Sequence, residues 1–202
     1  MDIDINTNIM MKYILTGLLL SICFFSCTEK KQVDANQLRR DSIRERKNYI
    51  VQVRSFIEIV NGKNQLSLND NLNDSDYLNC IEQLKYDTSV FTQDEIAYIL
   101  ERSHNSALKK WTKELVPTAR IINGDTIKLI FNNYDKMWPY FHKKIGKDLT
   151  TFSAPIFFRN NQYCIFYKGF HCGDRCGEGE LSLYKREGKG WKKIKTYCSW
   201  IA

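Results

Sequence analysis

The stretch QYCIFYKGFHCGDRCGEGELSLYKREGKGWKKIKTYCSW, residues 162–200, decides the fold of this chain. Three runs of apolar and aromatic residues in it are separated by two clusters of glycines and charged side chains. This pattern predicts three strands, over residues 162–170, 180–186 and 191–200, joined by two tight turns. Consecutive strands that are joined by tight turns pair in an antiparallel fashion, so we expect a β-meander.

The register of this meander follows from the positions of its turns. If one turn centres on Asp174 and the next falls at residues 187–190, apolar residues of neighbouring strands meet on one face, as a one-sided core requires. The opposite face carries Cys164 and Phe166, and we expect a helix to cover part of it. The expected cross-strand rows are Ile165–Leu183–Ile194, Tyr167–Leu181–Thr196 and Gly169–Gly179–Cys198.

The preceding half of the chain carries helical signals instead. Apolar residues recur at intervals of three and four from Tyr49 to Val60, and Asn61 follows them in a stop signal. Thr92 and Glu95 form a capping box, which marks the start of a further helix. The expected elements are helices over 49–60, 76–86, from 92 onward, 108–115 and 137–145, a loop over 61–76, a hairpin of 119–122 with 126–131 around residues 123–125, and a strand over 154–158.

Helices that precede an antiparallel sheet define the α+β class. We therefore expect N-terminal helices followed by a mainly antiparallel C-terminal sheet, in a single domain over residues 49–202. The length of 202 residues leaves room for about one domain. An apolar content of 43 % argues against a disordered chain, and the lack of a sequence repeat argues against a solenoid or propeller.

The N-terminal part of the chain indicates export. Lys12 precedes an apolar run from Tyr13 to Phe25. This run is shorter than the about 20 residues that span a bilayer, and it matches the core of a secretory signal. Ser26 and Cys27 follow, and they resemble the lipobox of bacterial lipoproteins, in which the cysteine is acylated and becomes the first mature residue.

These features divide the N-terminal region. We expect a lipoprotein signal peptide over residues 1–26, with translation starting at Met10 or Met11, and a lipidated N-terminus and tether over 27–48. Acyl chains such as palmitate on Cys27 would hold the protein on the outer membrane of a bacterial cell envelope, facing the periplasm. The expected partners are the membrane and an envelope protein or glycan, and nucleic acid is not expected despite the formal net charge of +7. A membrane anchor that stays attached is the alternative.

Cys172 and Cys176 bracket the first turn of the expected meander. A disulfide that closes this short loop is the leading interpretation, because an exported protein meets oxidising conditions. Reduced buried thiols, a redox-active pair and a metal site are the alternatives. The metal site would consist of His171, Cys172, Cys176 and Cys198, whose side chains suit zinc. The three cysteines of the domain outside this turn leave at least one thiol that we expect to be free and buried.

A pattern of the form S-x-P-I-F, then C-G-x-x-C-G-x-G, then two tryptophans runs through about the last 50 residues. It is formed by Ser153, Pro155, Ile156, Phe157, Cys172, Gly173, Cys176, Gly177, Gly179, Trp191 and Trp200. This pattern resembles a group of small uncharacterised lipoproteins of Bacteroides-type bacteria. The resemblance implies an envelope lipoprotein and brings no activity, substrate or catalytic residue with it.

A strongly basic segment covers residues 185–195, at the second turn of the meander. Its positive residues are Lys185, Arg186, Lys189, Lys192, Lys193 and Lys195. One interpretation is contact with anionic lipid headgroups. The other is a solvated sheet edge that lysines protect against aggregation.

No catalytic motif accompanies these features. The chain contains no Gly-Xaa-Ser-Xaa-Gly elbow, phosphate-binding loop or His-Glu-Xaa-Xaa-His sequence, and no cofactor is expected. His104 and His142 fit surface or capping positions better than the role of a base. The sequence therefore favours a membrane-anchored envelope lipoprotein that acts as a non-catalytic binding or structural module, although an enzyme stays open. The alternative function is thiol-redox chemistry or metal binding at His171, Cys172 and Cys176.

Overall fold

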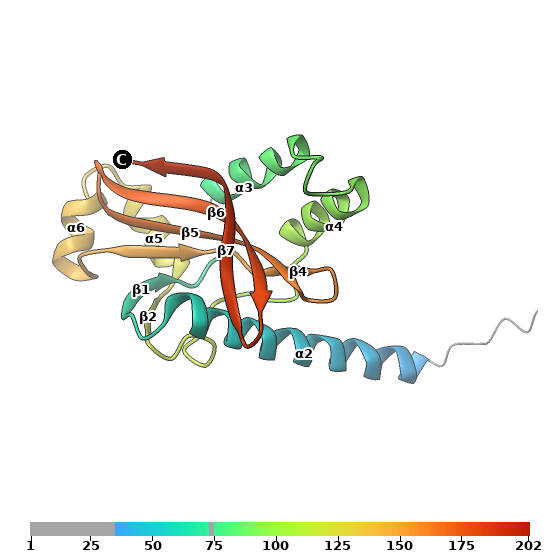
Figure 1. Cartoon of the computed structure of the whole chain (residues 1–202). Coiled ribbons are helices and arrows are strands. Elements are labelled where there is room, and N and C mark those ends of the chain that lie inside the picture. Colours follow the sequence, from blue (N-terminus) through green and yellow to red (C-terminus); the bar gives the residue numbers. More distant parts are fainter. Residues whose placement is uncertain (1–34, 73–74) are drawn as a thin grey trace, which may run out of the picture. The chain divides into compact units, whose positions relative to one another are not determined.

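The computed structural model describes residues 35–72 and 75–202. The chain divides at Ile43, and residues Arg44–Ala202 form the larger compact unit. In the described part of the smaller unit, residues 35–43 are helical, and Gln37 Nε2 donates a hydrogen bond of 3.0 Å to Asp41. The elements in chain order are α2 (Ala35–Asn61), β1 (Leu66–Asn69), α3 (Ser75–Ile81), the 3₁₀ helix η1 (Glu82–Tyr86), α4 (Gln93–His104), β2 (Ala119–Ile122), α5 (Gly124–Phe131), α6 (Met137–Lys144), β3 (Leu149–Phe152), β4 (Ile156–Phe158), β5 (Tyr163–Gly173), β6 (Cys176–Glu187) and β7 (Gly190–Ile201) (Figure 1).

The described strands form one seven-stranded sheet. Their hydrogen-bonded order is β2-β1-β3-β5-β6-β7, and β4 pairs with β5 beside this path. β1 pairs in parallel with β2 and with β3, whereas the pairings of β3 with β5, β4 with β5, β5 with β6 and β6 with β7 are antiparallel. The expected α+β class with a mainly antiparallel sheet is therefore confirmed. The expected order of helices first and strands last holds only in part, because β1 and β2 lie among the helices.

Both faces of the sheet are covered, because β5 alternates its side chains between two apolar clusters. Cys164 and Phe166 pack on one side against the part of α2 that contains Val53 and Phe56. Phe56 is fully buried, and its ring makes an edge contact with the ring of Phe166 at 5.2 Å between centroids. The helix that was expected over this face is α2, and it ends where Gly62 adopts a φ of +62°.

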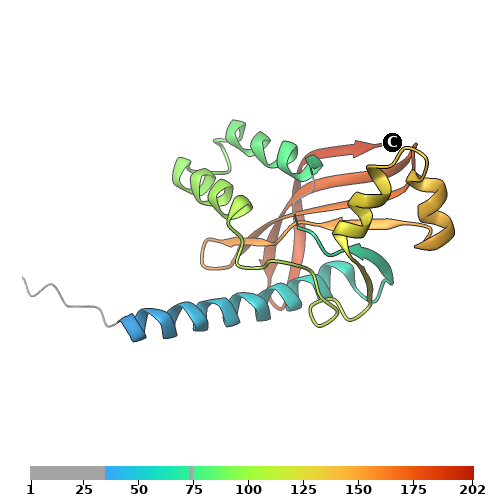
Figure 2. The same ribbon diagram turned by 180° about the vertical axis from the view of Figure 1, so that it is seen from behind.

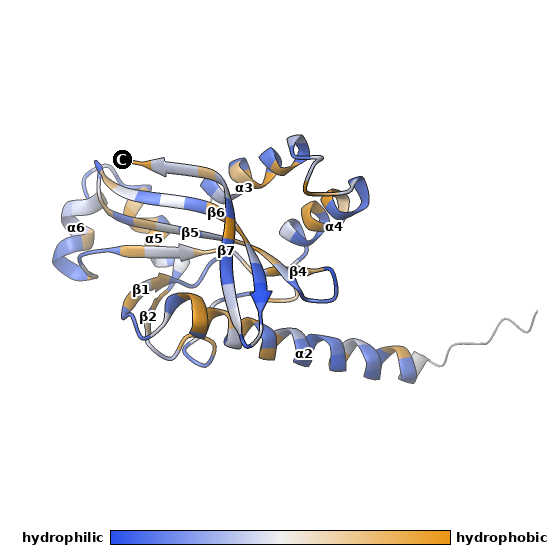
Figure 3. Ribbon diagram, viewed as in Figure 1, coloured by the Kyte–Doolittle hydropathy of each residue, from blue (hydrophilic) through white to orange (hydrophobic). Residues whose placement is uncertain are grey.

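The opposite face of the sheet is covered by α3, η1 and α4 (Figure 2). Ile165 and Tyr167 of β5 contact this layer, together with Leu181 and Leu183 of β6. α4 begins at the expected capping box, since Thr92 accepts from the backbone N–H of Glu95 and the Glu95 side chain accepts from the backbone of Thr92. Figure 3 shows apolar and polar residues alternating around these helices, as expected for helices with one buried side.

The expected hairpin around residues 123–125 is wrong. Asn123 instead caps α5, because its side-chain oxygen accepts a hydrogen bond of 3.0 Å from the backbone N–H of Thr126. β2 does not fold back on the following residues but pairs in parallel with β1, with Leu66 opposite Ala119. The asparagine and glycine after β2 therefore start a helix and do not form a hairpin turn. β2 does not need the following residues as a partner, since it pairs with β1.

The expected register is right between β5 and β6 and wrong between β6 and β7. Ile165 lies opposite Leu183, and Tyr167 lies opposite Leu181, as predicted. In the pairing of β6 with β7, however, Leu183 lies opposite Lys195 and Leu181 lies opposite Cys198. The reason is that β7 has one extra, unpaired residue at each of two places along this ladder. These two bulges displace Cys198 by two residues along β6 from its expected position opposite Gly179.

Four further features of the structure differ from the expectations. The stretch 61–76, expected as a loop, contains β1, and the stretch before residue 153 contains β3. The apolar residues of 108–115 lie in an irregular segment rather than a helix. α2 begins at Ala35, inside the segment expected to be a tether.

Candidate functional site

The expected signal peptide and the lipidation residue Cys27 lie outside the described residues. Their assignment therefore remains a prediction. Within residues 35–72 and 75–202, no helix has the length and apolar character needed to cross a membrane.

Cys172 and Cys176 are paired in a disulfide at the turn between β5 and β6, with their Cα atoms 5.0 Å apart. The register between β5 and β6 shifts between His171 and Gly173, so the strand pairing is irregular next to this turn. Cys176 is exposed, and the His171 ring lies 5.0 Å from the ring of Trp200. This geometry is compatible with the disulfide that leads the sequence interpretation.

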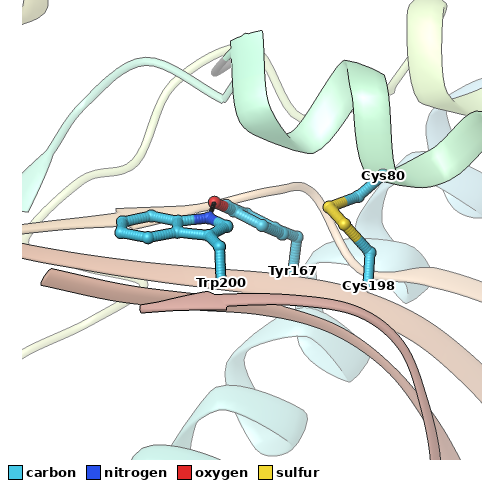
Figure 4. The surroundings of a disulfide bond; sticks show 4 residues. All are labelled: Cys80, Tyr167, Cys198 and Trp200. Carbon is cyan, nitrogen blue, oxygen red and sulfur yellow. Dashed lines mark hydrogen bonds between the residues drawn. A yellow bond between two sulfur atoms is a disulfide. The ribbon is translucent and has the colours of Figure 1, made fainter. Parts of the chain in front are cut away.

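Cys198 does not join this turn, because it is paired in a disulfide with Cys80 (Figure 4). The two Cα atoms are 5.3 Å apart, and the bridge connects α3 to β7 across 118 residues of sequence. In the described part of the chain, no group of three or more histidine, cysteine, aspartate or glutamate side chains could hold a metal ion. The residues of the alternative metal site, His171, Cys172, Cys176 and Cys198, are therefore not brought together as one ligand set.

The remaining cysteine of the described chain is Cys164, a free thiol that is fully buried. Its burial raises the pKa of the thiol well above the usual value. The expectation of at least one free buried thiol is confirmed. A thiol in this position is protonated and shielded from solvent, so it acts as a small apolar core residue.

The basic segment at the turn between β6 and β7 is partly neutralised. Lys193 Nζ lies 2.6 Å from Glu180, Lys195 Nζ lies 2.5 Å from Asp87, and Lys192 Nζ lies 3.9 Å from Glu187. Lys195 holds the pKa of the Asp87 carboxyl at about 2, below its ordinary value. Arg186 stacks over the ring of Trp191 at 5.8 Å. Lys185 and Lys189 complete the segment, and both are exposed.

A half-open cavity of about 270 Å³ lies beyond the carboxyl end of β1. Two leucines and five polar residues line it, and the polar residues are Asn71, Ser103, His104, Ser106 and Lys109. They come from the loop after β1, from the end of α4 and from the segment that follows α4. In open sheets of parallel strands, ligands bind beyond the carboxyl ends of the strands. β1 runs parallel to both of its neighbours, β2 and β3, and the cavity lies beyond its carboxyl end.

Asp70 holds the walls of this cavity together. Its carboxylate accepts a hydrogen bond of 2.8 Å from the backbone N–H of Gly124 and one of 3.1 Å from Lys110 Nζ. Its backbone N–H donates to the carbonyl of Ile122, and its own carbonyl accepts from the backbone N–H of Trp111, each at 2.9 Å. These four bonds fix the end of β1 against the start of α5 and against the segment after α4.

Two serines of the cavity are held in place by hydrogen bonds. Ser103 Oγ donates to the carbonyl three residues earlier in α4 at 2.7 Å, and Ser106 Oγ accepts from the backbone N–H two residues later at 3.1 Å. The phenol of Tyr77 interacts with Ser103 and that of Tyr49 with Ser106. Burial raises the pKa of both phenols, that of Tyr49 to about 12, and the serines oppose the rise. Both phenols are therefore protonated at neutral pH, and Tyr49 donates to the carbonyl of Pro155 at 3.0 Å.

The sequence pattern does not reveal this cavity. Asn71 follows β1 directly, but β1 lies in a stretch whose polar composition predicts a loop. His104 and Ser106 lie in a polar segment without any recognised motif. The one sequence feature that points to the cavity is the short run Leu66–Asn69, which is followed by polar residues. It can be recognised as a strand only when its pairing with β2 is known.

No protein-family model matches this chain, and comparisons with curated proteins and with solved structures find no significant match.

Proposed function

We propose that this protein is a membrane-anchored lipoprotein of a bacterial envelope, held on the outer membrane through Cys27 and acting as a non-catalytic binding module. The observation that carries the proposal is the disulfide between Cys80 and Cys198, which joins two elements that lie 118 residues apart. Structural disulfides of this kind persist in oxidising compartments and are rare in the cytosol. The compartment agrees with the apolar run that precedes Cys27 in the sequence.

A binding role suits the polar cavity better than catalysis does. Its serine hydroxyls are oriented by neighbouring hydrogen bonds, and its wall is tied to the sheet through Asp70. Prepared hydrogen-bonding groups of this kind reduce the cost of ordering on association. The lining does not pair a carboxylate with a nucleophile or a base.

The lipid anchor is tested by replacing its attachment residue. Cys27→Ser should move the protein from the membrane fraction to the soluble periplasmic fraction and abolish incorporation of labelled palmitate, because lipidation requires the thiol. Cys164→Ala is the matched control, since it removes a cysteine inside the fold and should leave the protein in the outer-membrane fraction. Unchanged fractionation and labelling of Cys27→Ser would show that the anchor is elsewhere.

The exposed position of Cys176 supports a second candidate function, thiol-redox chemistry at the turn between β5 and β6. Reductant can reach this disulfide, whereas Cys80 of the Cys80–Cys198 bridge is buried. Mass spectrometry of the protein from its native envelope distinguishes the two functions. A fully oxidised Cys172–Cys176 pair supports a structural bridge. A mixed redox state supports the second function.

A further inference from the structure

The cavity beyond β1 carries an uncompensated positive charge. Lys109 lines it and is exposed, and no ion pair involves this lysine among the described residues. Two carboxylates of the neighbouring segments are engaged elsewhere, because Asp70 binds Gly124 and Lys110, and Glu101 lies 3.6 Å from Arg102 and accepts from Asn105. A cation beside hydroxyl and amide groups, with no acidic residue among the described residues of the lining, is suited to an anion.

The size and the other lining groups restrict the kind of anion. A volume of about 270 Å³ lies just below the range of about 300–1,000 Å³ that holds drug-sized ligands, so the occupant is compact. Asn71 offers both an amide donor and an acceptor. Ser103 and Ser106 offer oxygen lone pairs, because the Ser103 hydroxyl already donates to a carbonyl of α4. An amide together with accepting hydroxyl oxygens is suited to the hydroxyl groups of a polyol body.

We propose that this cavity binds a compact, hydroxylated oxyanion, with its carboxylate or phosphate group against Lys109 and its hydroxyl groups toward Asn71, Ser103 and Ser106. His104 lies on the same lining and contributes a further hydrogen-bonding nitrogen. The site is separate from the Cys172–Cys176 turn and from the basic segment after β6. It goes beyond the proposed envelope function and does not depend on the lipid at Cys27.

The test is isothermal titration calorimetry of the full chain, purified in detergent with its disulfides intact. Four probes are used: glucuronate, glucose 6-phosphate, inorganic phosphate and uncharged glucose. We expect glucuronate or glucose 6-phosphate to bind at least about 10-fold more tightly than glucose, since a charged hydrogen bond is worth about 1.5–3 kcal/mol and 1.4 kcal/mol is tenfold. The comparison of glucuronate with the two phosphates identifies the anionic group.

Two variants assign the binding to this cavity. Lys109→Glu and Asn71→Asp each place a negative charge on the lining and should weaken binding of the oxyanion at least about 10-fold. Lys189→Glu makes the same charge reversal at the turn between β6 and β7, and it should leave the affinity unchanged. Lys109 is exposed, so its replacement should not alter the melting temperature.

The proposal is overturned if no oxyanion of the panel binds, if glucose binds as tightly as the charged probes, or if both cavity variants bind like the wild type. A loss of affinity in Lys189→Glu equal to that in Lys109→Glu would also overturn it, because the anion would then be responding to total charge. The Cys27→Ser variant should bind the oxyanion as the wild type does, so failure of the lipid anchor and failure of this site give different results.

Discussion

The indole Nε1 of Trp200 donates a hydrogen bond of 3.0 Å to the hydroxyl of Tyr167 (Figure 4). Both side chains lie against Gly179. Tyr167 belongs to β5 and Trp200 to β7, so the bond passes across the whole width of β6. A side chain on Gly179 would occupy the space between these two rings. The glycine is thus required by close approach of the aromatic groups and not by its backbone conformation.

Gly179→Ala is expected to lower the free energy of unfolding by about 2 kcal/mol, because the new Cβ would clash with the Trp200 indole and lie 2.7 Å from the Tyr167 hydroxyl. Urea denaturation with intact disulfides measures the change. Gly190→Ala is the control, since its Cβ would meet Glu187 O at an ordinary 3.6 Å. Equal effects of both substitutions would show that loss of glycine, and not the clash, is responsible.

The two disulfides should contribute unequally to stability. Loop-closure entropy predicts about 5 kcal/mol for the bridge across 118 residues and about 2 kcal/mol for the bridge across four. The double variant Cys80→Ala, Cys198→Ala should therefore lose more stability in urea than Cys172→Ala, Cys176→Ala. A larger loss for the second variant would mean that the short hairpin organises the fold, contrary to its exposed position.

Cys164 should resist modification as long as the protein is folded. Its thiol is fully buried, and burial raises its pKa, so very little thiolate is available to react. Iodoacetamide at neutral pH should leave Cys164 unmodified in native protein and modify it after denaturation without reductant. Peptide mapping measures both states. Modification of Cys80 or Cys198 in the denatured, unreduced sample would contradict the disulfide between them.

Features that depend on neighbouring residues in sequence are predictable. The capping box of Thr92 and Glu95 lies within one helical turn, and it marks the start of α4 correctly. The pairing of Ile165 with Leu183 follows from one tight turn and from alternating apolar residues, and it is also correct. In both cases the interacting groups are fixed by local geometry, so no knowledge of the rest of the fold is needed.

Features that depend on distant segments are not predictable in this way. The local sequence predicts that Gly124 lies in a hairpin turn. In the structure its N–H donates to Asp70, which lies 54 residues earlier. Cys198 shares a sheet face with Ile165, but its pairing with Cys80 requires the bulges of β7 and the placement of α3. The cavity beyond β1 combines residues from two segments about 30 positions apart, and the hydrogen bond from the Trp111 N–H to the Asp70 carbonyl joins these segments.

Acid should weaken the contact between α4 and the turn after β4. Arg159 binds both carboxylate oxygens of Glu95, at 2.6 and 2.8 Å, and this pairing lowers the pKa of Glu95 from its ordinary 4.5 to about 2. A carboxyl with a lowered pKa in the folded state stabilises the fold above about pH 4.5, and that stabilisation is lost as the pH falls from 4.5 toward 2. Because the Arg159 side chain is 35 % exposed, solvent screening leaves a contribution of about 1 kcal/mol.

The matched variant Glu95→Gln separates this contribution from the general effect of acid. It should unfold at lower urea than the wild type at pH 7, by about 1 kcal/mol, and the difference should shrink toward zero near pH 2. The Asp87 carboxyl, whose pKa Lys195 also lowers to about 2, is present in both proteins and cancels in the comparison. A difference that stays constant from pH 7 to pH 2 would mean that the ion pair does not contribute and that Glu95 acts only through the neutral hydrogen bonds of the capping box.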